Sequence, residues 1–220
     1  SRVYAESNLF NEQGGLIKRT RLTKVVNAAK DQYFNRYINA FGVDSLKGVN
    51  VVMYQHSAVG RDLIVDILKK LGAKVTPVGR SDVFVPIDSE NITAEDQEYF
   101  NELAHEHRVC DAIISTDGDS DRPFLIDEKG VFNRGDVLGL PTTEYLGTKA
   151  VALPISSNDA VTNWLVQHDI KYSLTKIGSP YVIDAMDQLL KDHSLVSGWE
   201  VNGGYLLGSD IDLSNGLLAR

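Results

Sequence analysis

The stretch Cys110-Asp-Ala-Ile-Ile-Ser-Thr-Asp-Gly-Asp-Ser-Asp-Arg-Pro-Phe-Leu-Ile-Asp127 lies near the middle of the chain and joins two apolar runs through an acidic segment. The runs at 112–114 and 124–126 have the composition of β-strands. Between them, aspartates stand at every second position: Asp117, Asp119 and Asp121. Three carboxylates this close repel one another unless a cation lies among them, and their hard oxygens suit Mg²⁺ or Ca²⁺. The stretch therefore predicts a metal-binding loop between two strands.

The composition is that of a globular protein and narrows the range of partners. The chain has 220 residues, enough for one large domain or two small ones, with 43% hydrophobic and 24% charged residues. Its net charge is −8 without a long basic run, which argues against nucleic acid as a partner but leaves room for a small anionic ligand. Cys110 is the only cysteine, which excludes a disulfide framework and a cysteine zinc site. No apolar segment approaches the ~20 residues of a membrane span, and no signal-peptide pattern opens the chain. A cytoplasmic protein without a membrane partner is expected.

The spacing of apolar residues predicts an α/β fold. Helical spacing marks segments at 22–41, 61–71, 94–107, 136–147, 158–168 and 178–191. Short apolar runs typical of strands alternate with them, at 49–54, 74–78, 110–115, 123–126, 131–133, 149–155, 170–174 and 195–199. A strand, a helix and a strand in succession imply parallel strands with a right-handed crossover. We therefore predict two successive α/β domains with mixed, mainly parallel sheets.

Single residues mark the ends of several predicted elements. Thr93 is a favourable N-cap for the helix that follows it. Gly42 and Gly72 are suited to end the helices before them, because glycine adopts the left-handed conformation of a helix C-terminus. The last residues, 216–220, are expected to form the first turn of a helix. Together with an irregular start at 1–20, this predicts a fragment of a longer protein.

Two other types of site share part of the acidic pattern. In a calcium-binding EF-hand loop, Asp117 would open the loop and Glu128 would close it at position 12, but position 6 requires glycine and here is Arg122. In phosphatases of the haloacid dehalogenase type, Asp117 would be the nucleophile and Asp119 the general acid, but the later acidic pair of those enzymes has no convincing counterpart. A metal-dependent sugar phosphatase and a non-catalytic metal-binding module therefore remain alternatives.

Several segments together resemble motifs of the α-D-phosphohexomutase superfamily, the phosphomannomutases and phosphoglucomutases. Thr116-Asp-Gly-Asp-Ser-Asp-Arg122 resembles its magnesium loop, usually D-G-D-G-D-R or D-G-D-A-D-R. Thr175-Lys-Ile-Gly178 resembles its T-x-V-G segment, and Gly198-Trp-Glu-Val-Asn-Gly-Gly204 resembles its G-E-x-S-G-H sugar-recognition loop. Asn215-Gly-Leu-Leu-Ala219 resembles the D-G-I-x-A helix start that follows, and Tyr54–Gly60 loosely resembles the strand-loop-helix opening of the second domain.

The resemblance, which extends over residues 30–220, has departures and omissions. Asn202 stands where the sugar loop usually has serine, and Ser179-Pro180 follow Gly178 where a basic residue is common. The 220 residues contain neither the T-A-S-H-N phosphoserine loop of the first domain nor the R-x-S-G-T-E-P phosphate loop of the fourth. Only domains 2 and 3 are therefore implied. We expect a linker or first-domain tail at 1–26, domain 2 at 27–132, and domain 3, truncated at its C-terminus, at 133–220.

The resemblance also implies an activity and the residues that perform it. It implies a phosphohexomutase that interconverts hexose 1-phosphate and hexose 6-phosphate through an enzyme phosphoserine and a bisphosphate intermediate. Mannose is favoured because the 200–204 loop lacks the pattern expected of the glucosamine enzymes. Mg²⁺ would be held by Asp117, Asp119 and Asp121, and Arg122 would be catalytic, facing the phosphoryl group. The implied substrate-binding residues are Glu200, Asn202, Gly203, Thr175, Gly178 and Ser179. The hexose phosphate and the absent domains 1 and 4 are the implied partners, and this chain alone is expected to be inactive.

Two conspicuous side chains have structural interpretations. His56 lies in a loop after a predicted strand, where polar residues commonly form turns. Trp199 stands beside Glu200 at the end of a predicted strand and is expected to be a buried anchor. Neither residue is predicted to contact a ligand.

Overall fold

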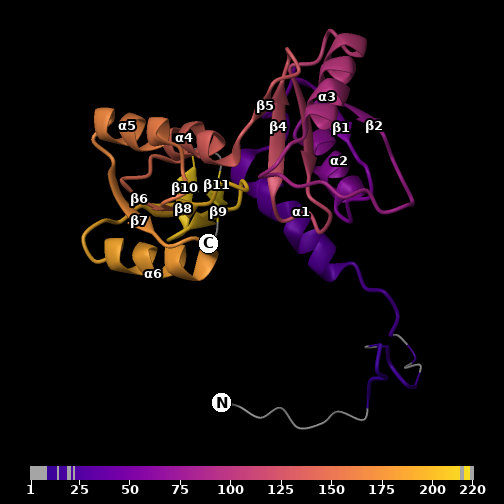
Figure 1. The fold of residues 1–220 in the computed structure, drawn as a ribbon, viewed down its shortest axis with the longest axis horizontal. Coiled ribbons are helices and arrows are strands. Elements are labelled where there is room, and N and C mark those ends of the chain that lie inside the picture. Colours follow the sequence, from indigo (N-terminus) through magenta and orange to yellow (C-terminus); the bar gives the residue numbers. More distant parts are fainter. Residues whose placement is uncertain (1–8, 14, 19–20, 22, 214–215, 219–220) are drawn as a thin grey trace. The chain divides into compact units, whose positions relative to one another are not determined.

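The computed structural model describes residues 9–13, 15–18, 21, 23–213 and 216–218. The described residues fall into two units, divided between Gln32 and Tyr33. In the first unit, Phe10 forms an isolated antiparallel bridge with Leu16, and the remaining described residues before 21 are irregular, as predicted. Helix α1 (Ala28–Phe41) begins in the first unit and continues into the second (Figure 1).

The first lobe of the second unit, residues 33–133, is built on a five-stranded sheet in the order β2-β1-β3-β4-β5. Its strands are β1 (Asn50–Tyr54), β2 (Lys74–Val78), β3 (Ala112–Thr116), β4 (Pro123–Asp127) and β5 (Phe132–Asn133). Strand β1 pairs in parallel with β2 and β3, whereas β4 is antiparallel to β3 and β5 is antiparallel to β4. Helices α2 (Arg61–Lys70) and α3 (Ala94–Glu106) are the crossovers. The two crossovers run in opposite directions along the sheet, so right-handed connections place the helices on opposite faces.

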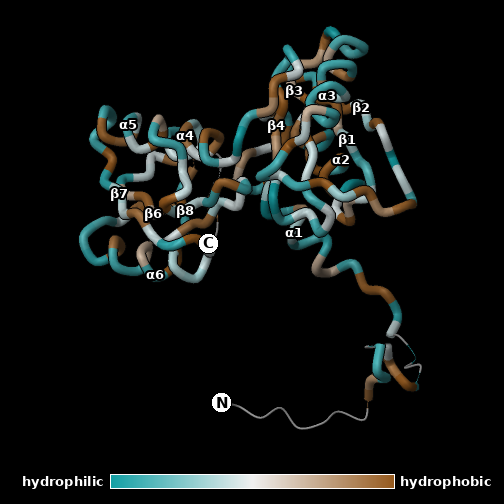
Figure 2. Tube along the Cα trace, in the orientation of Figure 1, coloured by the Kyte–Doolittle hydropathy of each residue, from teal (hydrophilic) through white to brown (hydrophobic). Residues whose placement is uncertain are grey.

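The first core lies between this sheet and α3. Val52, Ile113 and Ile126 point from three neighbouring strands toward Phe100 and Leu103 of α3, and all five side chains are buried. Figure 2 shows the apolar segments along the strands, while polar and apolar residues alternate along the helices.

None of the helices in the described part of the chain is long and apolar enough to cross a membrane.

The second lobe, residues 134–218, has a four-stranded sheet in the order β7-β6-β8-β9. Its strands are β6 (Ala150–Pro154), β7 (Lys171–Thr175), β8 (Val196–Trp199) and β9 (Tyr205–Leu207). Its helices are α4 (Gly135–Leu146), α5 (Asp159–Gln167) and α6 (Ser179–Leu189). Along β6, Ala150 and Ala152 pack in one cluster with α6, and Val151 and Leu153 pack in another with α5. The alternation of a strand thus directs successive side chains to helices on opposite faces.

Four strands of the first sheet, in the order β2-β1-β3-β4, have the same topology as the four strands of the second sheet, in the order β7-β6-β8-β9. In each, a central strand pairs in parallel with two neighbours, and the third parallel strand is followed by an antiparallel one. The acidic loop between β3 and β4 therefore corresponds to the 200–204 loop between β8 and β9. The predicted α/β fold with mixed, mainly parallel sheets is confirmed, and both segments singled out in the sequence lie at equivalent places in the two lobes.

Several predicted helix ends are also confirmed. The Thr93 hydroxyl accepts a hydrogen bond from the Asp96 backbone N–H, and the Asp96 carboxylate accepts one from the Thr93 N–H, which forms a complete capping box. Asn158 caps α5 through the N–H of Ala160. Gly42 has the positive φ of 82° expected after a helix. Helix α4 continues through Pro141, although proline removes one of its hydrogen bonds.

Two predicted elements are wrong. The helix expected to start at Leu22 begins at Ala28, and the exposed side chains of Val25 and Val26 (92% and 78%) lie outside it. Valine is a poor helix former, whereas Asn27 suits the position just before a helix. The helix turn expected at 216–220 is instead a strand, β11 (Gly216–Leu218), which pairs with β10 (Ile211–Leu213). Residues 215, 219 and 220 of that motif lie outside the described residues.

Candidate functional site

The acidic loop begins where β3 ends and closes on itself over six residues. The N–H of Asp117 bonds to the carbonyl of Arg122 (3.1 Å), and the N–H of Ser120 bonds to the carbonyl of Asp117 (3.3 Å). Ser120 has a positive φ of 69°, which is uncommon for a residue with a side chain. This compact turn brings one carboxylate oxygen from each of Asp117, Asp119 and Asp121 within 4.8 Å of the others. The predicted acidic cluster is therefore present in space as well as in sequence.

The electrostatics of the cluster favour a cation. Asp117 is buried, whereas Asp119 and Asp121 are exposed. The negative charge of Asp117, followed by that of Asp121, raises the pKa of the Asp119 carboxyl above its ordinary value. Like charges that lack compensation raise a carboxyl pKa in this way. The three carboxylates supply hard oxygen donors, so the group could hold a metal ion. The strands on both sides exclude the EF-hand interpretation, which requires helices.

The Arg122 guanidinium forms ion pairs with two carboxylates of its own loop. Its Nε is 2.6 Å from Oδ2 of Asp117 and 3.4 Å from Oδ1 of Asp121. Partial burial opposes the charged form of Arg122, but the neighbouring aspartates outweigh it, and the pKa lies above its ordinary value. Arg122 therefore remains a fixed positive charge at the edge of the acidic cluster.

A cavity of about 460 Å³ borders the acidic loop within the first lobe. Asp117, Asp119 and Arg122 line one side of it, and the segment after β2 lines the other with Phe84 and Ile87. A ligand of the size of a phosphoryl group could therefore reach the carboxylates and the guanidinium from the same opening.

The 200–204 loop in the second lobe is a tight hairpin. The N–H of Glu200 bonds to the carbonyl of Gly204 (3.0 Å), and the N–H of Gly203 bonds to the carbonyl of Glu200 (3.1 Å). The side-chain oxygen of Asn202 accepts the Gly204 N–H at 2.9 Å, and Gly203 has a φ of 93°. The Glu200 carboxylate makes no hydrogen bond or ion pair with the residues that the structure describes, so both of its oxygens can accept from a ligand.

The Thr175–Ser179 segment lies at the same edge of the second sheet. Strands β7 and β8 both run parallel to β6, and Thr175 and Trp199 are the last residues of β7 and β8. Ligands of α/β sheets bind beyond the carboxyl ends of such strands. Gly178 has a φ of 122° and precedes α6, which starts at Ser179. The structure thus brings the two predicted substrate-binding segments to one edge of one sheet.

Sequence patterns did not identify the residues that support the 200–204 loop. A Cβ added to Gly139 would lie 2.2 Å from the Trp199 ring, and one added to Gly135 would lie 2.1 Å from the backbone of Gly203. These two glycines let α4 pack directly against the loop. The Trp199 indole N–H also donates to the Asp136 carbonyl at 3.0 Å. The four-residue spacing of Gly135 and Gly139 on one helix face was the available sequence signal.

The Asp136 carboxylate is a second support that the sequence did not reveal. It is fully buried at the start of α4 and accepts hydrogen bonds from the N–H of Val137 (3.0 Å) and of Asn158 (2.8 Å). It also pairs with Arg134 at 3.3 Å. It therefore ties the start of α4 to the start of α5, next to Trp199.

Comparison with known proteins assigns both lobes. Residues 31–130 match the family model for phosphoglucomutase/phosphomannomutase, alpha/beta/alpha domain II, and residues 136–220 match the model for domain III. The chain is 42% identical over 201 residues to a phosphomannomutase of Salmonella muenchen, covering 91% of this chain and 41% of that protein. It is 27% identical over 217 residues to a phosphoglucosamine mutase of Aliarcobacter butzleri, covering 93% of this chain and 47% of that protein. The chain thus spans less than half the length of these relatives.

Solved structures share the fold. A phosphoglucomutase/phosphomannomutase family protein from Burkholderia thailandensis matches with a TM-score of 0.64 and 17% identity, over 81% of this chain and 39% of that one. The phosphoglucomutase parafusin from Paramecium matches with a TM-score of 0.55 and 18% identity, over 86% of this chain and 37% of that one. With both lobes matched by consecutive domain models, this chain belongs to the phosphoglucomutase/phosphomannomutase family and carries its domains II and III.

Proposed function

We propose that this chain forms the metal-loop and sugar-recognition domains of a phosphohexomutase, which converts hexose 1-phosphate to hexose 6-phosphate through an enzyme phosphoserine and a bisphosphorylated sugar. The observation that carries the proposal is the cluster of three carboxylates at the end of β3, in a lobe that matches domain II of the family. Mannose is the proposed sugar, because identity to a phosphomannomutase is 42% and identity to a phosphoglucosamine mutase is 27%.

We assign Mg²⁺ to Asp117, Asp119 and Asp121. Hard carboxylate oxygens are the ligands that Mg²⁺ prefers, and the mutual repulsion of the three groups is relieved by a divalent cation. When bound, the ion would neutralise negative charge on a phosphoryl group during transfer. The buried Asp117 and the exposed Asp119 and Asp121 would hold the ion together, and exposure of the last two would keep the cluster accessible to a phosphate group.

Arg122 has a proposed catalytic role beside the metal. Its guanidinium borders the 460 Å³ cavity together with two of the aspartates. A guanidinium presents several N–H donors in a planar fork that matches phosphate oxygens. Arg122 can keep one contact with Asp117 and direct its remaining N–H groups to the phosphoryl group.

The hexose has to be held in two orientations, so that either its 1-position or its 6-position faces the phosphoserine. We propose that Glu200, Asn202 and Gly203 grip its hydroxyl groups. The Glu200 carboxylate accepts hydrogen bonds, and the Asn202 amide keeps its NH₂ group as a donor, because only its oxygen is used within the loop. An acceptor beside a donor can bind two adjacent hydroxyls whichever way the ring is turned. Thr175, Gly178 and Ser179 are the proposed contacts at the same sheet edge.

The proposed domain boundaries are 27–132 and 133–220, with residues 1–26 as a linker. The phosphoserine loop and the second phosphate-binding loop would come from domains 1 and 4 of the same longer protein, because neither motif occurs in these 220 residues. A coupled assay of the full-length protein with mannose 1-phosphate and glucose 1-phosphate tests the function. We expect hexose 6-phosphate without release of phosphate and with preference for mannose. Free phosphate as the main product would indicate a phosphatase, and no reaction with either sugar would contradict the proposal.

The 220-residue chain alone is expected to give no turnover of mannose 1-phosphate above the uncatalysed background. The reason is that the group that donates and accepts the phosphoryl moiety is absent from its sequence. The measurement is the same coupled assay on the purified chain, with the full-length protein as positive control. Mutase activity of the chain alone would show that a residue within it carries the phosphoryl group.

Replacing Glu200 by alanine in the full-length protein is expected to raise KM for mannose 1-phosphate and lower kcat, reducing kcat/KM by about 10- to 100-fold. This is the effect of losing hydrogen bonds to a charged acceptor. Mg²⁺ affinity should not change, because Glu200 is outside the acidic cluster. Glu144→Ala, at an exposed position on α4, is the matched control. Equal kinetics for the two variants would remove Glu200 from the sugar site.

A further inference from the structure

A second loop contacts the acidic loop along its length. Residues 55–60, which follow β1 and which we call the cradle, make two hydrogen bonds to it and a third to Thr116, the β3 residue just before it. His56 Nε2 donates to the Thr116 carbonyl (2.8 Å), and the Val59 N–H donates to the Gly118 carbonyl (3.0 Å). The Gly60 N–H donates to the Ser120 hydroxyl (2.9 Å). The three contacted residues alternate with the three aspartates, so the cradle holds the acidic loop without using any of its carboxylates.

The hydrogen bond from Gly60 to Ser120 supports a residue of the acidic loop that has an unfavourable backbone conformation. Ser120 has a φ of 69°, a conformation that costs free energy for a residue with a side chain. Its hydroxyl is also 3.1 Å from the Thr116 hydroxyl, so two bonds hold the side chain in place. A Cβ added to Gly60 would lie 2.9 Å from the Ser120 Cβ, and the glycine therefore permits the close approach.

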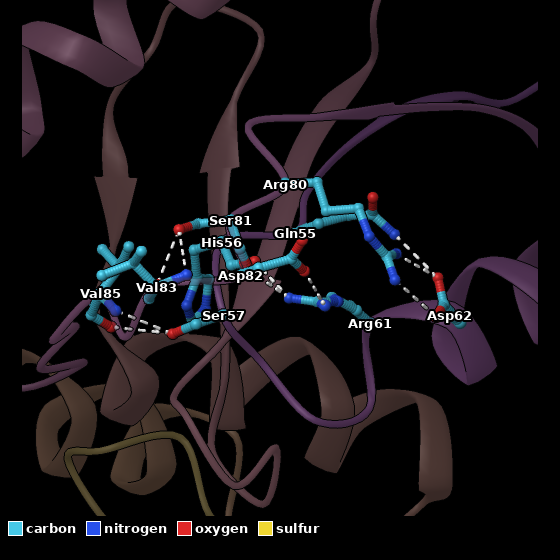
Figure 3. Close-up of polar contacts among 10 residues, drawn as sticks. All are labelled: Gln55, His56, Ser57, Arg61, Asp62, Arg80, Ser81, Asp82, Val83 and Val85. Carbon is cyan, nitrogen blue, oxygen red and sulfur yellow. Dashed lines mark hydrogen bonds and ion pairs between the residues drawn. The ribbon is translucent and has the colours of Figure 1, made fainter.

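Arg61 holds the cradle in turn. Its Nη1 donates to the carbonyls of His56 (2.8 Å) and Ser81 (2.6 Å), and its Nη2 pairs with Asp82 (3.3 Å). Figure 3 shows the guanidinium directed at these three residues. His56 itself has an unusual φ of 30° and a fully buried ring, so its peptide needs such support. Burial lowers the pKa of His56, which keeps the ring neutral, with its proton on the nitrogen that faces Thr116.

A ligand-binding role for Arg61 fits less well. The Arg61 side chain is only 16% exposed, and two backbone carbonyls and a carboxylate already engage three of its five N–H donors. A second arginine in Figure 3, Arg80, provides a contrast. Its pair with Asp62 (2.6 Å) lies in solvent, with side chains 47% and 66% exposed. Arg61 thus braces backbone, whereas Arg80 forms a surface ion pair.

We infer that the cradle, braced by Arg61, is a positioning device that presets the acidic loop for a divalent cation, so that Arg61 and the Ser120 hydroxyl control metal affinity without supplying a carboxylate. This inference rests on the proposed metal function of the loop. Three like charges tend to spread the loop apart, and a backbone held at residues 116, 118 and 120 resists that spreading. Preorganisation of this kind raises affinity because less order has to be imposed when the ion binds.

Titration of the 220-residue chain with Mg²⁺ by calorimetry tests the inference. We expect Arg61→Gln to weaken Mg²⁺ binding by about 10- to 100-fold, because losing a residue that positions metal ligands commonly weakens binding by this factor. Ser120→Ala should weaken it about 3- to 10-fold, through the loss of the two hydrogen bonds that hold the Ser120 side chain. Arg80→Gln is the matched control and should bind as the unmodified chain does. Circular dichroism establishes that each variant is folded.

Amide hydrogen exchange on the same proteins without metal gives an independent result. We expect faster exchange at Gly60 and Asp117 in Arg61→Gln but not in Arg80→Gln. If the unmodified chain does not bind Mg²⁺, the proposed metal function fails. The exchange result alone then decides whether Arg61 and the cradle hold the acidic loop in place. Folded Arg61→Gln with unchanged affinity and unchanged exchange would overturn the inference. If Arg61→Gln does not fold, Ser120→Ala decides, and unchanged affinity and exchange in that variant would overturn it.

Discussion

The Asp119→Asn variant is expected to bind Mg²⁺ at least about 100-fold more weakly than the unmodified chain. A metal ligand contributes more to the affinity than the residues that only position the ligands. Asparagine has the same shape but loses the negative charge, and the acidic cluster would retain only two carboxylates. Asp119 is exposed, so the fold does not depend on it. Calorimetric titration with Mg²⁺ measures the affinity.

The same variant is not expected to lower the stability of the metal-free protein. The pKa of Asp119 is raised mainly by the charge of Asp117, so removing the Asp119 charge relieves repulsion in the metal-free protein. The melting temperature without Mg²⁺ should therefore stay the same or rise, while the increase caused by Mg²⁺ should disappear. Asp169→Asn is the matched control, since Asp169 is exposed and also has a positive φ (53°) that asparagine tolerates. An Mg²⁺-dependent rise in melting temperature that survives in Asp119→Asn would contradict the assigned role.

Replacing Trp199 by alanine is expected to lower the free energy of unfolding by about 3–5 kcal/mol, as removal of a buried aromatic side chain does. Trp199 is fully buried and packs with Val151 and Leu153 of β6. Its ring stacks on Tyr205 with centroids 5.5 Å apart, and its N–H bonds to the Asp136 carbonyl. The cost therefore combines lost apolar burial, a cavity and an unpaired carbonyl.

The second tryptophan of the chain is the matched control for this variant. Trp164 is only partly buried and stacks on His168, so Trp164→Ala should cost less than about 2 kcal/mol. Trp199→Phe keeps the aromatic body but removes the N–H, and an intermediate loss is expected. Urea denaturation followed by far-ultraviolet circular dichroism measures all three. A Trp199→Ala variant no less stable than Trp164→Ala would contradict the anchoring role.

Elements with local signals were predicted well. Strand β2 was predicted with its observed limits, because glycines stand on both sides of its apolar run. Thr93 was identified as a helix cap, because the capping box involves residues only three apart. The acidic loop closes through bonds between residues no more than five apart, so its clustering also follows from adjacent sequence.

The errors occurred where distant residues compete with local pattern. The segment after Gly216 has the composition of a helix start, yet it forms β11, because pairing with β10 buries Ile211 and Leu218. The apolar spacing before Ala28 suggested a longer helix, but Val25 and Val26 have no core to face and remain exposed. Helical spacing alone does not reveal whether a buried surface is available.

The α/β alternation, the two-lobed order and the clustering of Asp117, Asp119 and Asp121 could be predicted from the amino-acid sequence, because these features depend on periodicity and on neighbours along the chain. The residues that support the candidate sites could be identified only from the folded structure. His56, interpreted as a structural loop residue, proved to hold the acidic loop across 60 positions of sequence. Trp199 reaches Asp136 across 63 positions. The first contact arises because the parallel strands β1 and β3 bring their carboxyl ends to one edge of a sheet, and the second arises because α4 packs on β8. No local pattern encodes which segments then meet.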